Sequence, residues 1–299
     1  MATTAIQTTG LTKYYGTNLG VADLDLEVGR GEVFGFLGPN GAGKTTTIRL
    51  LLDLIRPSSG SIEVLGLEVA ADSVAIRRRI GYLPGELNLY ERLRAGELLE
   101  FLGRLRGGVE RERIRRMAER LGLDLSRQID DLSKGNKQKV GVVAAFMHDP
   151  ELLILDEPTS GLDPLRQHDV HELIRERVAE GGTVFLSTHA LDEASEVADR
   201  VGIIREGRLV GIEQVAALRE RTVRELEVAF DGPVPELRID ELDGVTALKA
   251  SDGRLRLRVE GPMDQLVKEL ARHPVRTLTS QPPELEEVFL SYYGDPDED

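Results

Sequence analysis

Short apolar segments alternate with longer amphipathic segments through most of the chain. Strand-like apolar runs occupy Glu32–Leu37, Ile80–Leu83, Leu152–Leu155, Thr183–Ser187 and Val201–Arg205. Apolar strands of this length are typical of a parallel sheet that helices cover on both faces. The pattern therefore predicts an α/β fold for this part of the chain.

Two segments between these strands have helical spacing and many charged positions. Ala95–Arg106 and Val109–Leu121 place apolar residues on one face of a helix and charges on the other. They predict a helical insertion at about residues 87–149.

The spacing changes again beyond residue 220. Glu225–Phe230 and Arg254–Val259 alternate apolar and polar residues, as half-buried strands do. Helical stretches follow at Met263–Arg272 and Pro283–Tyr293. The chain beyond residue 220 therefore reads as a small α+β domain.

Length and charge give the domain organisation. A chain of 299 residues corresponds to about two domains, and residues 222–299 hold twice as many acidic as basic residues. We expect a first domain at residues 1–220, a second at residues 221–294, and a disordered acidic tail at residues 295–299.

Composition excludes several classes of protein. The net charge of −14 argues against broad binding to nucleic acid through its phosphates. Without cysteine, the chain has no disulfide, thiolate metal site or cysteine nucleophile. The longest apolar run, Val142–Met147, is too short to cross a membrane, and Met1–Gly10 lacks the features of a secretion signal. We therefore expect a cytoplasmic location and no nucleic-acid partner.

A glycine-rich loop follows the first apolar strand and fits the pattern GxxxxGK[ST]. Its residues are Gly38, Pro39, Asn40, Gly41, Ala42, Gly43, Lys44 and Thr45. Backbone N–H groups of such a loop point at phosphate oxygens, Lys44 reaches the β and γ phosphates, and Thr45 ligates Mg²⁺. A simple turn is the alternative reading, but the strand before the loop and the helical stretch Thr46–Ile55 after it favour a phosphate site.

Two carboxylates follow another apolar strand, Leu152–Leu155. Asp156 and Glu157 stand at its carboxyl end, where open α/β sheets place their ligands. Asp156 suits the Mg²⁺ shell, and Glu157 suits the orientation or deprotonation of an attacking water. Taken alone, this pattern is common, but beside the phosphate loop it predicts a phosphoryl-transfer site.

Three further segments resemble the motifs of ATP-binding cassette (ABC) ATPases in order and spacing: LSKGNKQ at Leu132–Gln138, LLILDEPTSGLD at Leu152–Asp163, and Thr188–His189 after a strand. The resemblance covers roughly Ile6–Glu220. In addition, PELEEVFLSYY at Pro283–Tyr293 is similar to the ending of bacterial ABC exporter ATPases of the antibiotic and drug-resistance branch. The resemblance as a whole implies a P-loop NTPase core with an ABC-type helical subdomain, followed by a small α+β C-terminal domain.

The resemblance also implies roles for residues of the chain's own nucleotide site. Tyr15 stacks on adenine, although Tyr14 beside it is an alternative, and Gly38–Thr46 hold the phosphates. Asp156 and Glu157 become the Walker B aspartate and the catalytic glutamate. His189 contacts the γ-phosphate, although a histidine at such a position can also be structural.

A second set of residues is implied to act on the nucleotide of a partner subunit. Ser133 and Gly135 belong to the signature segment, and Asp163 links the two sites across a homodimer. Ser133 stands just before an apolar helix, Val140–Met147, and a hydroxyl with backbone N–H groups there suits an anion. A helix cap without further function is the alternative for Ser133.

The chain departs from the family pattern at two motifs. The signature normally reads LSGGQ, and here Lys134 replaces its first glycine while Asn136 replaces its glutamine. We expect the signature to work nevertheless, because Ser133 and Gly135 remain. Gly85 stands where the family has a glutamine that ligates Mg²⁺, so either the neighbouring Glu86 or water takes that place.

The implied function is that of an ATP-hydrolysing subunit that uses ATP and Mg²⁺. A membrane-embedded permease is the expected partner, docking near Leu83–Ala95, and the chain then lies on the inner face of the cell membrane. Charged residues there, including Arg92 and Arg94, are candidates for that contact, and a solvated helix face is the alternative for most of them. The expected process is export of an unidentified substrate. A soluble ABC-type ATPase and a non-hydrolysing, ATP-dependent switch are the alternatives.

Overall fold

The computed structural model describes residues 4–220, 224–239, 242–259, 261 and 263–281. The chain forms two compact units, Met1–Glu213 and Gln214–Asp299. The division lies upstream of the expected boundary at residue 220, because the helix α8 (Val215–Glu220) belongs to the second unit. The predicted helical stretch Pro283–Tyr293 and the acidic tail lie outside the described residues.

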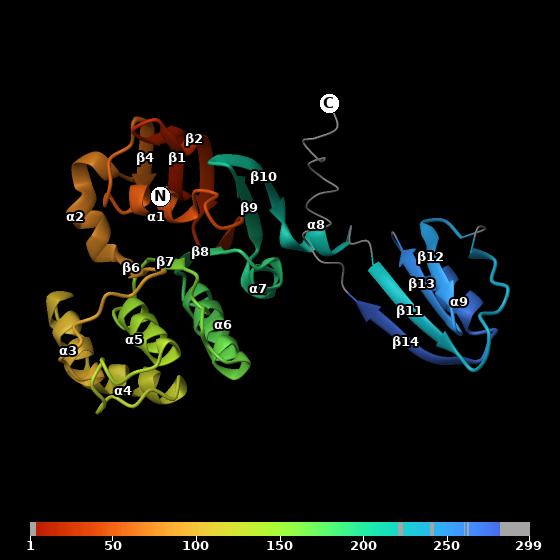
Figure 1. Ribbon diagram of the computed structural model, residues 1–299. Helices are drawn as coiled ribbons and strands as arrows, with labels where there is room; N and C mark the ends of the chain where they lie inside the picture. Colours follow the sequence, from red (N-terminus) through yellow and green to blue (C-terminus); the bar gives the residue numbers. More distant parts are fainter. Residues whose placement is uncertain (1–3, 221–223, 240–241, 260, 262, 282–299) are drawn as a thin grey trace. The chain divides into compact units, whose positions relative to one another are not determined.

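The first unit is built on a six-stranded sheet, in which β9, β3, β8, β7 and β6 run parallel (Figure 1). In sheet order the strands are β10 (Arg208–Gln214), β9 (Arg200–Arg205), β3 (Val33–Leu37), β8 (Thr183–Thr188), β7 (Leu152–Asp156) and β6 (Ile80–Leu83). Every residue of β3, β7 and β8 is buried, as continuous apolar runs require in a sheet covered on both faces. The predicted parallel α/β sheet is confirmed.

The first unit also contains an antiparallel sheet, which shares a hydrophobic core with the large sheet. Its order is β2 (Asn18–Gly29), β1 (Thr4–Tyr15), β4 (Ser59–Val64) and β5 (Leu67–Glu68). One cluster of buried side chains joins both sheets to the helices α1 (Lys44–Leu51) and α2 (Val69–Arg79), with Phe34, Phe36 and Phe185 among its largest members. This core fixes the strand that precedes the glycine-rich loop.

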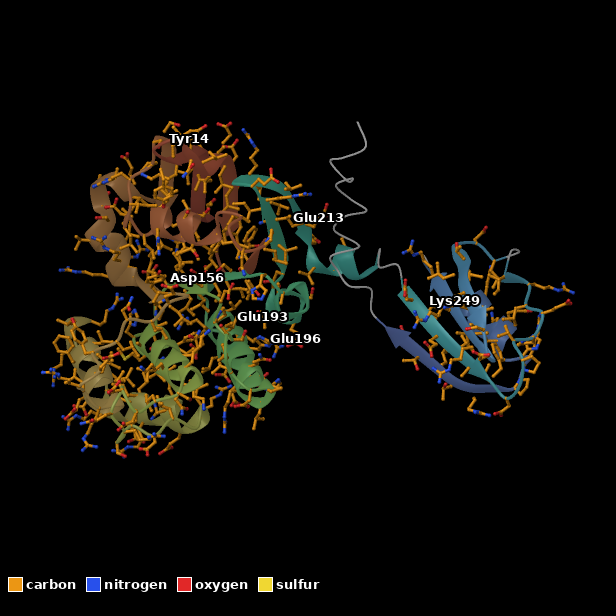
Figure 2. All side chains as sticks on the ribbon, in the orientation of Figure 1. Tyr14, Asp156, Glu193, Glu196, Glu213 and Lys249 are labelled. Carbon is orange, nitrogen blue, oxygen red and sulfur yellow. The ribbon has the colours of Figure 1, made fainter. Side chains whose placement is uncertain are left out.

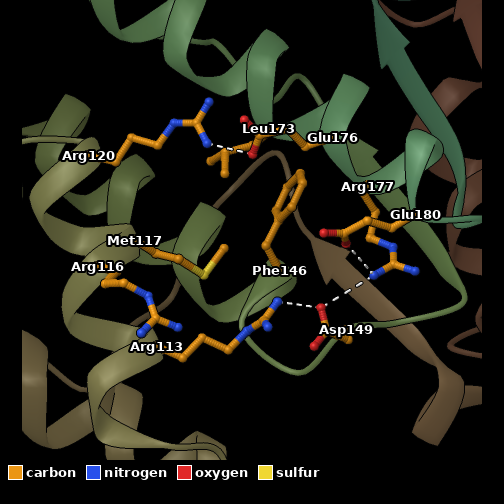
Figure 3. A pocket seen from close by; sticks show the side chains of 10 residues that line it. All are labelled: Arg113, Arg116, Met117, Arg120, Phe146, Asp149, Leu173, Glu176, Arg177 and Glu180. Atoms are coloured by element: carbon orange, nitrogen blue, oxygen red, sulfur yellow. Dashed lines mark hydrogen bonds and ion pairs between the residues drawn. The ribbon is translucent and has the colours of Figure 1, made fainter.

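The helical insertion contains α3 (Ala95–Leu105), α4 (Arg111–Arg120) and α5 (Lys134–Phe146). Helix α5 begins well before the apolar stretch at Val140, because Ser133 caps it and its first turn is polar. Ion pairs tie α4 and the end of α5 to α6 (Pro164–Ala179). Asp149 accepts hydrogen bonds from both Arg113 and Arg177, and all three residues line a pocket of about 310 Å³ (Figure 3).

The second unit is a four-stranded antiparallel sheet with one helix. The strand order is β12 (Val245–Ser251), β13 (Arg254–Val259), β11 (Arg224–Phe230) and β14 (Val275–Gln281). Helix α9 (Asp264–Leu270) packs Leu266 and Leu270 into the same core as Leu226 and Leu257. None of the helices in the described part of the chain has the length and apolar character of a membrane span.

Candidate functional site

Three adjacent parallel strands bring the predicted site residues to one edge of the large sheet. In the register of the sheet, Leu37 at the end of β3 pairs with Thr188 at the end of β8, and Asp156 at the end of β7 pairs with Ser187. The glycine-rich loop, Glu157 and His189 each follow one of these strand ends. The carboxyl edge of the sheet therefore gathers residues that are far apart in sequence.

The glycine-rich loop needs glycine at two positions for lack of space. A Cβ atom on Gly38 would lie 2.3 Å from the carbonyl oxygen of Ile204, and one on Gly43 would lie 2.7 Å from that of Gly20. Gly43 also has a φ of 111°, a conformation that side chains disfavour, and it precedes the first residue of α1. The loop is held tightly against the helix N-terminus, which suits an anion.

Lys44 is the first residue of α1 and is almost completely buried, with 6% of its surface exposed. Its ammonium donates to the carbonyl oxygens of Gly38 at 2.5 Å and Pro39 at 3.2 Å, so it lies within the curve of the loop. Burial lowers the pKa of Lys44, while the charges of Glu157 and Asp156 oppose that shift. A phosphate in the loop would add an anionic partner for this cation.

Thr45 and Asp156 meet where the sequence predicts a Mg²⁺ site. The hydroxyl of Thr45 donates to Oδ2 of Asp156 at 2.9 Å, and the hydroxyl of Ser187 donates to its other oxygen, Oδ1. A hydroxyl and a carboxylate with nucleotide phosphates nearby form the hard oxygen donor set that Mg²⁺ prefers. The residues present therefore fit Mg²⁺.

Gly85 borders this pair of oxygens. A Cβ atom on Gly85 would lie 3.1 Å from Oδ2 of Asp156, so the side chain of any larger residue there would begin beside the carboxylate. Glu86 is exposed and lines a cavity of about 360 Å³ together with Lys134, Lys137 and Gln138. Among the described contacts, no hydrogen bond joins Glu86 to Thr45 or Asp156, and its role as a Mg²⁺ ligand stays a prediction.

Glu157 and His189 are in direct contact. The imidazole Nδ1 lies 3.0 Å from Oε1 of Glu157, and the Glu157 backbone has a φ of 50°. That conformation is uncommon for a residue with a side chain and is held here by the surrounding structure. The amide of Gln138 contributes by donating to the carbonyl oxygens of Glu157 and Pro158 at 3.0 and 3.1 Å.

Gln138 and Ser187 were not among the predicted site residues. Gln138 is only 3% exposed and Ser187 is fully buried, and both hold the segment that carries the two acidic residues. Ser187 offered a signal, because it is a polar side chain that directly follows the apolar run of β8, whereas Gln138 stands among polar residues at the start of α5 and offered none.

The signature segment lies against the loop that contains Asp163. Ser133 caps α5, and its hydroxyl oxygen accepts from the N–H of Asn136 at 3.3 Å. A Cβ atom on Gly135 would lie 2.6 Å from the carbonyl oxygen of Gly161, so the two segments touch through their backbones. Asp163 in turn caps α6 by accepting from Arg166. The roles of these residues toward a partner's nucleotide stay predictions.

Tyr15 lies beside the end of the glycine-rich loop. A Cβ atom on Gly20 would lie 3.0 Å from Cε2 of Tyr15 and 3.2 Å from the methyl group of Thr46, so both side chains border the same position. Lys13 places its ammonium 5.4 Å from the centre of the Tyr15 ring. Tyr14 and Tyr15 are about equally exposed, at 46% and 45%. This proximity to Thr46 favours Tyr15 for stacking on a base.

Comparison with known proteins identifies the family. The sequence model of the family described as ABC transporter matches residues 21–160. The daunorubicin/doxorubicin resistance ATP-binding protein of Streptomyces peucetius is 36% identical, over 99% of this chain and 94% of its own. The chain belongs to the ATP-binding proteins of ABC transporters. A second ABC relative, the bacitracin transport ATP-binding protein of Enterococcus faecalis, is 32% identical over 97% of this chain and 96% of its own.

Solved ABC structures share the fold. One described as the ATP-binding subunit of an ABC transporter is 33% identical, with a TM-score of 0.66, over 72% of this chain and 92% of its own. An ATP-binding cassette solved as a dimer after hydrolysis, with ADP and Pi bound, has a TM-score of 0.64 at 23% identity, over 70% and 98% of the two chains. The predicted P-loop core and the predicted ABC family of the drug-exporter branch are confirmed, and this ABC protein is an ATPase.

Proposed function

We propose that this ABC ATPase powers the export of a substrate through a separate, membrane-embedded permease. The observation that carries the proposal is the convergence of Lys44, the Thr45–Asp156 pair and the Glu157–His189 pair at one edge of the sheet. These residues provide phosphate binding, a metal-binding oxygen pair and a base, which are the chain's own contributions to the hydrolysis of ATP. The relatives named for daunorubicin resistance and bacitracin transport support export as the coupled process.

The chain's own residues divide the work of hydrolysis. Backbone N–H groups of Gly38–Thr46 and the Lys44 ammonium hold the β and γ phosphates at the start of α1. Thr45 and Asp156 would hold Mg²⁺, which supplies charge neutralisation at the phosphates. Glu157 orients a water and accepts its proton as that water attacks the γ-phosphate. Its contact with His189 Nδ1 leaves Nε2 of the imidazole for the nucleotide.

A homodimer completes each site in this proposal. Ser133 and the backbone at the start of α5 present a hydroxyl and the positive end of the helix dipole, together with the exposed cation of Lys134. Asn136 and Asp163 lie in the same pair of touching segments. The related cassette solved as a dimer with ADP and Pi supports such an arrangement.

The permease contact is proposed for the segment Leu83–Ala95. Tyr90 is 64% exposed, and its ring meets the half-exposed ring of Phe101 edge to face at 6.3 Å between centroids. An exposed aromatic pair is typical of a surface that another protein covers. Arg92 lies on the same segment, whereas Arg94 is engaged with the carbonyl oxygen of Ser126. This contact would hold the chain on the cytoplasmic face of the membrane.

The test uses Glu157→Gln in the purified 299-residue chain with ATP and Mg²⁺. We expect hydrolysis to be abolished while ATP still binds, so that light scattering detects a stable ATP-bound dimer only for the variant. Equal dimer populations for wild type and variant would contradict the catalytic role of Glu157.

A second experiment tests the permease contact. The chain is purified from the membranes of cells that express it, and we expect a membrane protein to co-purify with wild type and to co-purify less with Tyr90→Ala.

A further inference from the structure

Glu193 forms a bridge between the two loops that carry Glu157 and His189. The hydroxyl of Thr159 donates to Oε1 of Glu193, and the hydroxyl of Thr188 donates to Oε2 at 2.5 Å. Thr159 follows Glu157 by two positions, and Thr188 directly precedes His189. One carboxylate on α7 (Leu191–Val197) therefore holds both loops; Figure 2 shows Glu193 on this helix.

We infer that Glu193 is a positioning residue for ATP hydrolysis, which sets the separation between Glu157 and His189. The inference rests on the proposed roles of those two residues. The direct Glu157–His189 contact joins the loops through an exposed His189 side chain and a partly buried Glu157 side chain, whereas Thr159 and Thr188 are 5% and 1% exposed. Buried hydroxyls that lost their acceptor would carry a larger free-energy cost than exposed ones, so the buried bridge constrains the loops more strongly.

The rest of the Thr188 environment supports this role. The N–H of Ala190 donates to the Thr188 hydroxyl oxygen at 3.0 Å, so this hydroxyl both accepts from the backbone and donates to Glu193. That pair of bonds fixes the backbone on either side of His189. The imidazole is thereby held in position by the turn rather than by its own contacts alone.

Helix α7 is itself fixed to the sheet. Ala194, the next residue after Glu193, is fully buried, and its Cβ lies 3.3 Å from the point where a Cβ on Gly35 would stand. Gly35 belongs to β3, the strand that leads into the glycine-rich loop. Through α7, Glu193 therefore fixes both loops relative to β3, the strand that leads into the phosphate site. A shift of about 1 Å in the position of a catalytic group costs on the order of a hundredfold in rate.

The test compares variants that keep or remove the bridge. Glu193→Ala removes both acceptors, and we expect kcat for ATP hydrolysis to fall on the order of tenfold to a hundredfold while KM for ATP changes less than about twofold. Glu193→Gln can accept from one threonine and donate to the other, so it should recover most of kcat. Thr159→Val should lower kcat, and Thr159→Ser should restore it.

Glu196→Ala is the matched control. Glu196 lies one turn further along α7 (Figure 2), with Oε2 2.7 Å from Nδ1 of His171, and among the contacts of the described residues no side-chain hydrogen bond joins it to either loop. Its kcat should equal that of wild type. Melting temperatures of all variants identify any that fail to fold, in which case the Thr159 pair decides. A Glu193→Ala or Thr159→Val variant with wild-type kcat, or a loss confined to KM, would overturn the inference.

The outcome for Glu157→Gln separates this inference from the proposed function. If Glu157→Gln abolishes hydrolysis and Glu193→Ala does not affect kcat, Glu193 has no positioning role and the proposed site stands. If Glu157→Gln retains hydrolysis, the proposed site is wrong whatever Glu193→Ala does.

Discussion

The Nδ1 atom of His189 lies 3.0 Å from Oε1 of Glu157, although 32 residues separate them along the chain. The contact joins the end of β7 to the end of β8, which are neighbours in the sheet. In the proposed function, His189 contacts both the base Glu157 and the γ-phosphate. The pair would then tie the position of Glu157 to the presence of the nucleotide.

Replacement of the imidazole should separate turnover from binding. We expect His189→Ala to lower kcat for ATP hydrolysis by about a hundredfold, because Glu157 loses its partner and the γ-phosphate loses a contact. KM should change little, since Lys44 and the loop still hold the phosphates. Steady-state hydrolysis assays measure both constants.

His189→Asn is the matched variant, because its amide N–H can replace Nδ1 as a donor to Glu157 but cannot reach as far as Nε2. A kcat between those of His189→Ala and wild type would show that the Glu157 contact matters separately. Wild-type kcat in His189→Ala would refute a catalytic role and favour a structural one.

The large sheet could be predicted because its strands are buried throughout. Every residue of β3 and β8 is buried, and short apolar runs mark both strands, VFGFL in β3 and VFL within β8. Parallel strands end at a common edge, which is why the convergence of Lys44, Asp156 and His189 also followed from the sequence. The antiparallel sheet was not predicted, because β1 is rich in threonine and its register with β2 shifts at several places, which disrupts strict alternation.

The sequence could not reveal the site residues whose contacts join distant segments of the chain. Gln138 lies in a helix whose spacing resembles a core helix, and nothing local shows that its amide reaches the carbonyl oxygen of Glu157. Glu193 reads as an ordinary charged position on a short helix, yet its carboxylate binds two threonines from different loops. Such residues emerge only when the strand order and the packing of the helices are known.

The position of Gly85 beside Asp156 gives a prediction about the metal. Gly85→Gln places an amide oxygen beside Oδ2 of Asp156, where a Cβ atom already lies 3.1 Å away, so Asp156 has to shift by a few tenths of an ångström. We expect the Mg²⁺ concentration for half-maximal hydrolysis to fall several-fold, because the site gains a hard oxygen ligand. Hydrolysis measured over a series of Mg²⁺ concentrations tests this.

Two variants control the Gly85 experiment. Gly85→Ala fills the same space without a ligand and should not lower the Mg²⁺ requirement. Glu86→Ala tests whether the neighbouring carboxylate is the ligand, since an unchanged requirement excludes direct ligation. A Gly85→Gln variant with the same requirement as Gly85→Ala would contradict the prediction.

The cap of α5 gives a prediction about the dimer. Ser133→Ala removes the hydroxyl that accepts from Asn136 N–H and that we propose to face the partner's phosphate. We expect hydrolysis to fall about tenfold or more, as for loss of one hydrogen bond to a transition-state phosphate, while ATP binding to the isolated chain is unchanged. Hydrolysis rates at several protein concentrations, with ATP titrations of each variant, measure the two effects.

Ser126→Ala is the control for Ser133→Ala. Ser126 lies in the same helical insertion, and its hydroxyl donates to Asp124 at 2.6 Å on the exposed surface. Hydrolysis by this variant should match wild type. Unchanged hydrolysis in Ser133→Ala would show that its hydroxyl is only a helix cap.

A partly buried histidine outside the site makes stability depend on pH. Nε2 of His148 lies 3.2 Å from the carbonyl oxygen of Ile80, which places the proton on Nε2, while the buried Nδ1 has no hydrogen-bond partner among the described residues. Burial, followed by the charge of Arg106, lowers the pKa of His148 from its ordinary value of 6.5. Below that value the unfolded chain binds a proton that the folded chain does not bind, so the free energy of unfolding decreases as pH falls from 6.5 toward the lowered pKa.

His148→Gln removes this titration and keeps an amide donor for Ile80. We expect its free energy of unfolding to depend less steeply on pH below 6.5, by at most about 1.4 kcal/mol per pH unit, which is the effect of one proton. Urea unfolding at several pH values between neutral and mildly acidic measures the slope, and carboxylates titrate alike in both proteins. His168→Gln, at an exposed position, shows how much any histidine contributes. Parallel slopes for wild type and His148→Gln would mean that the folded protein accepts the proton at Nδ1 without cost.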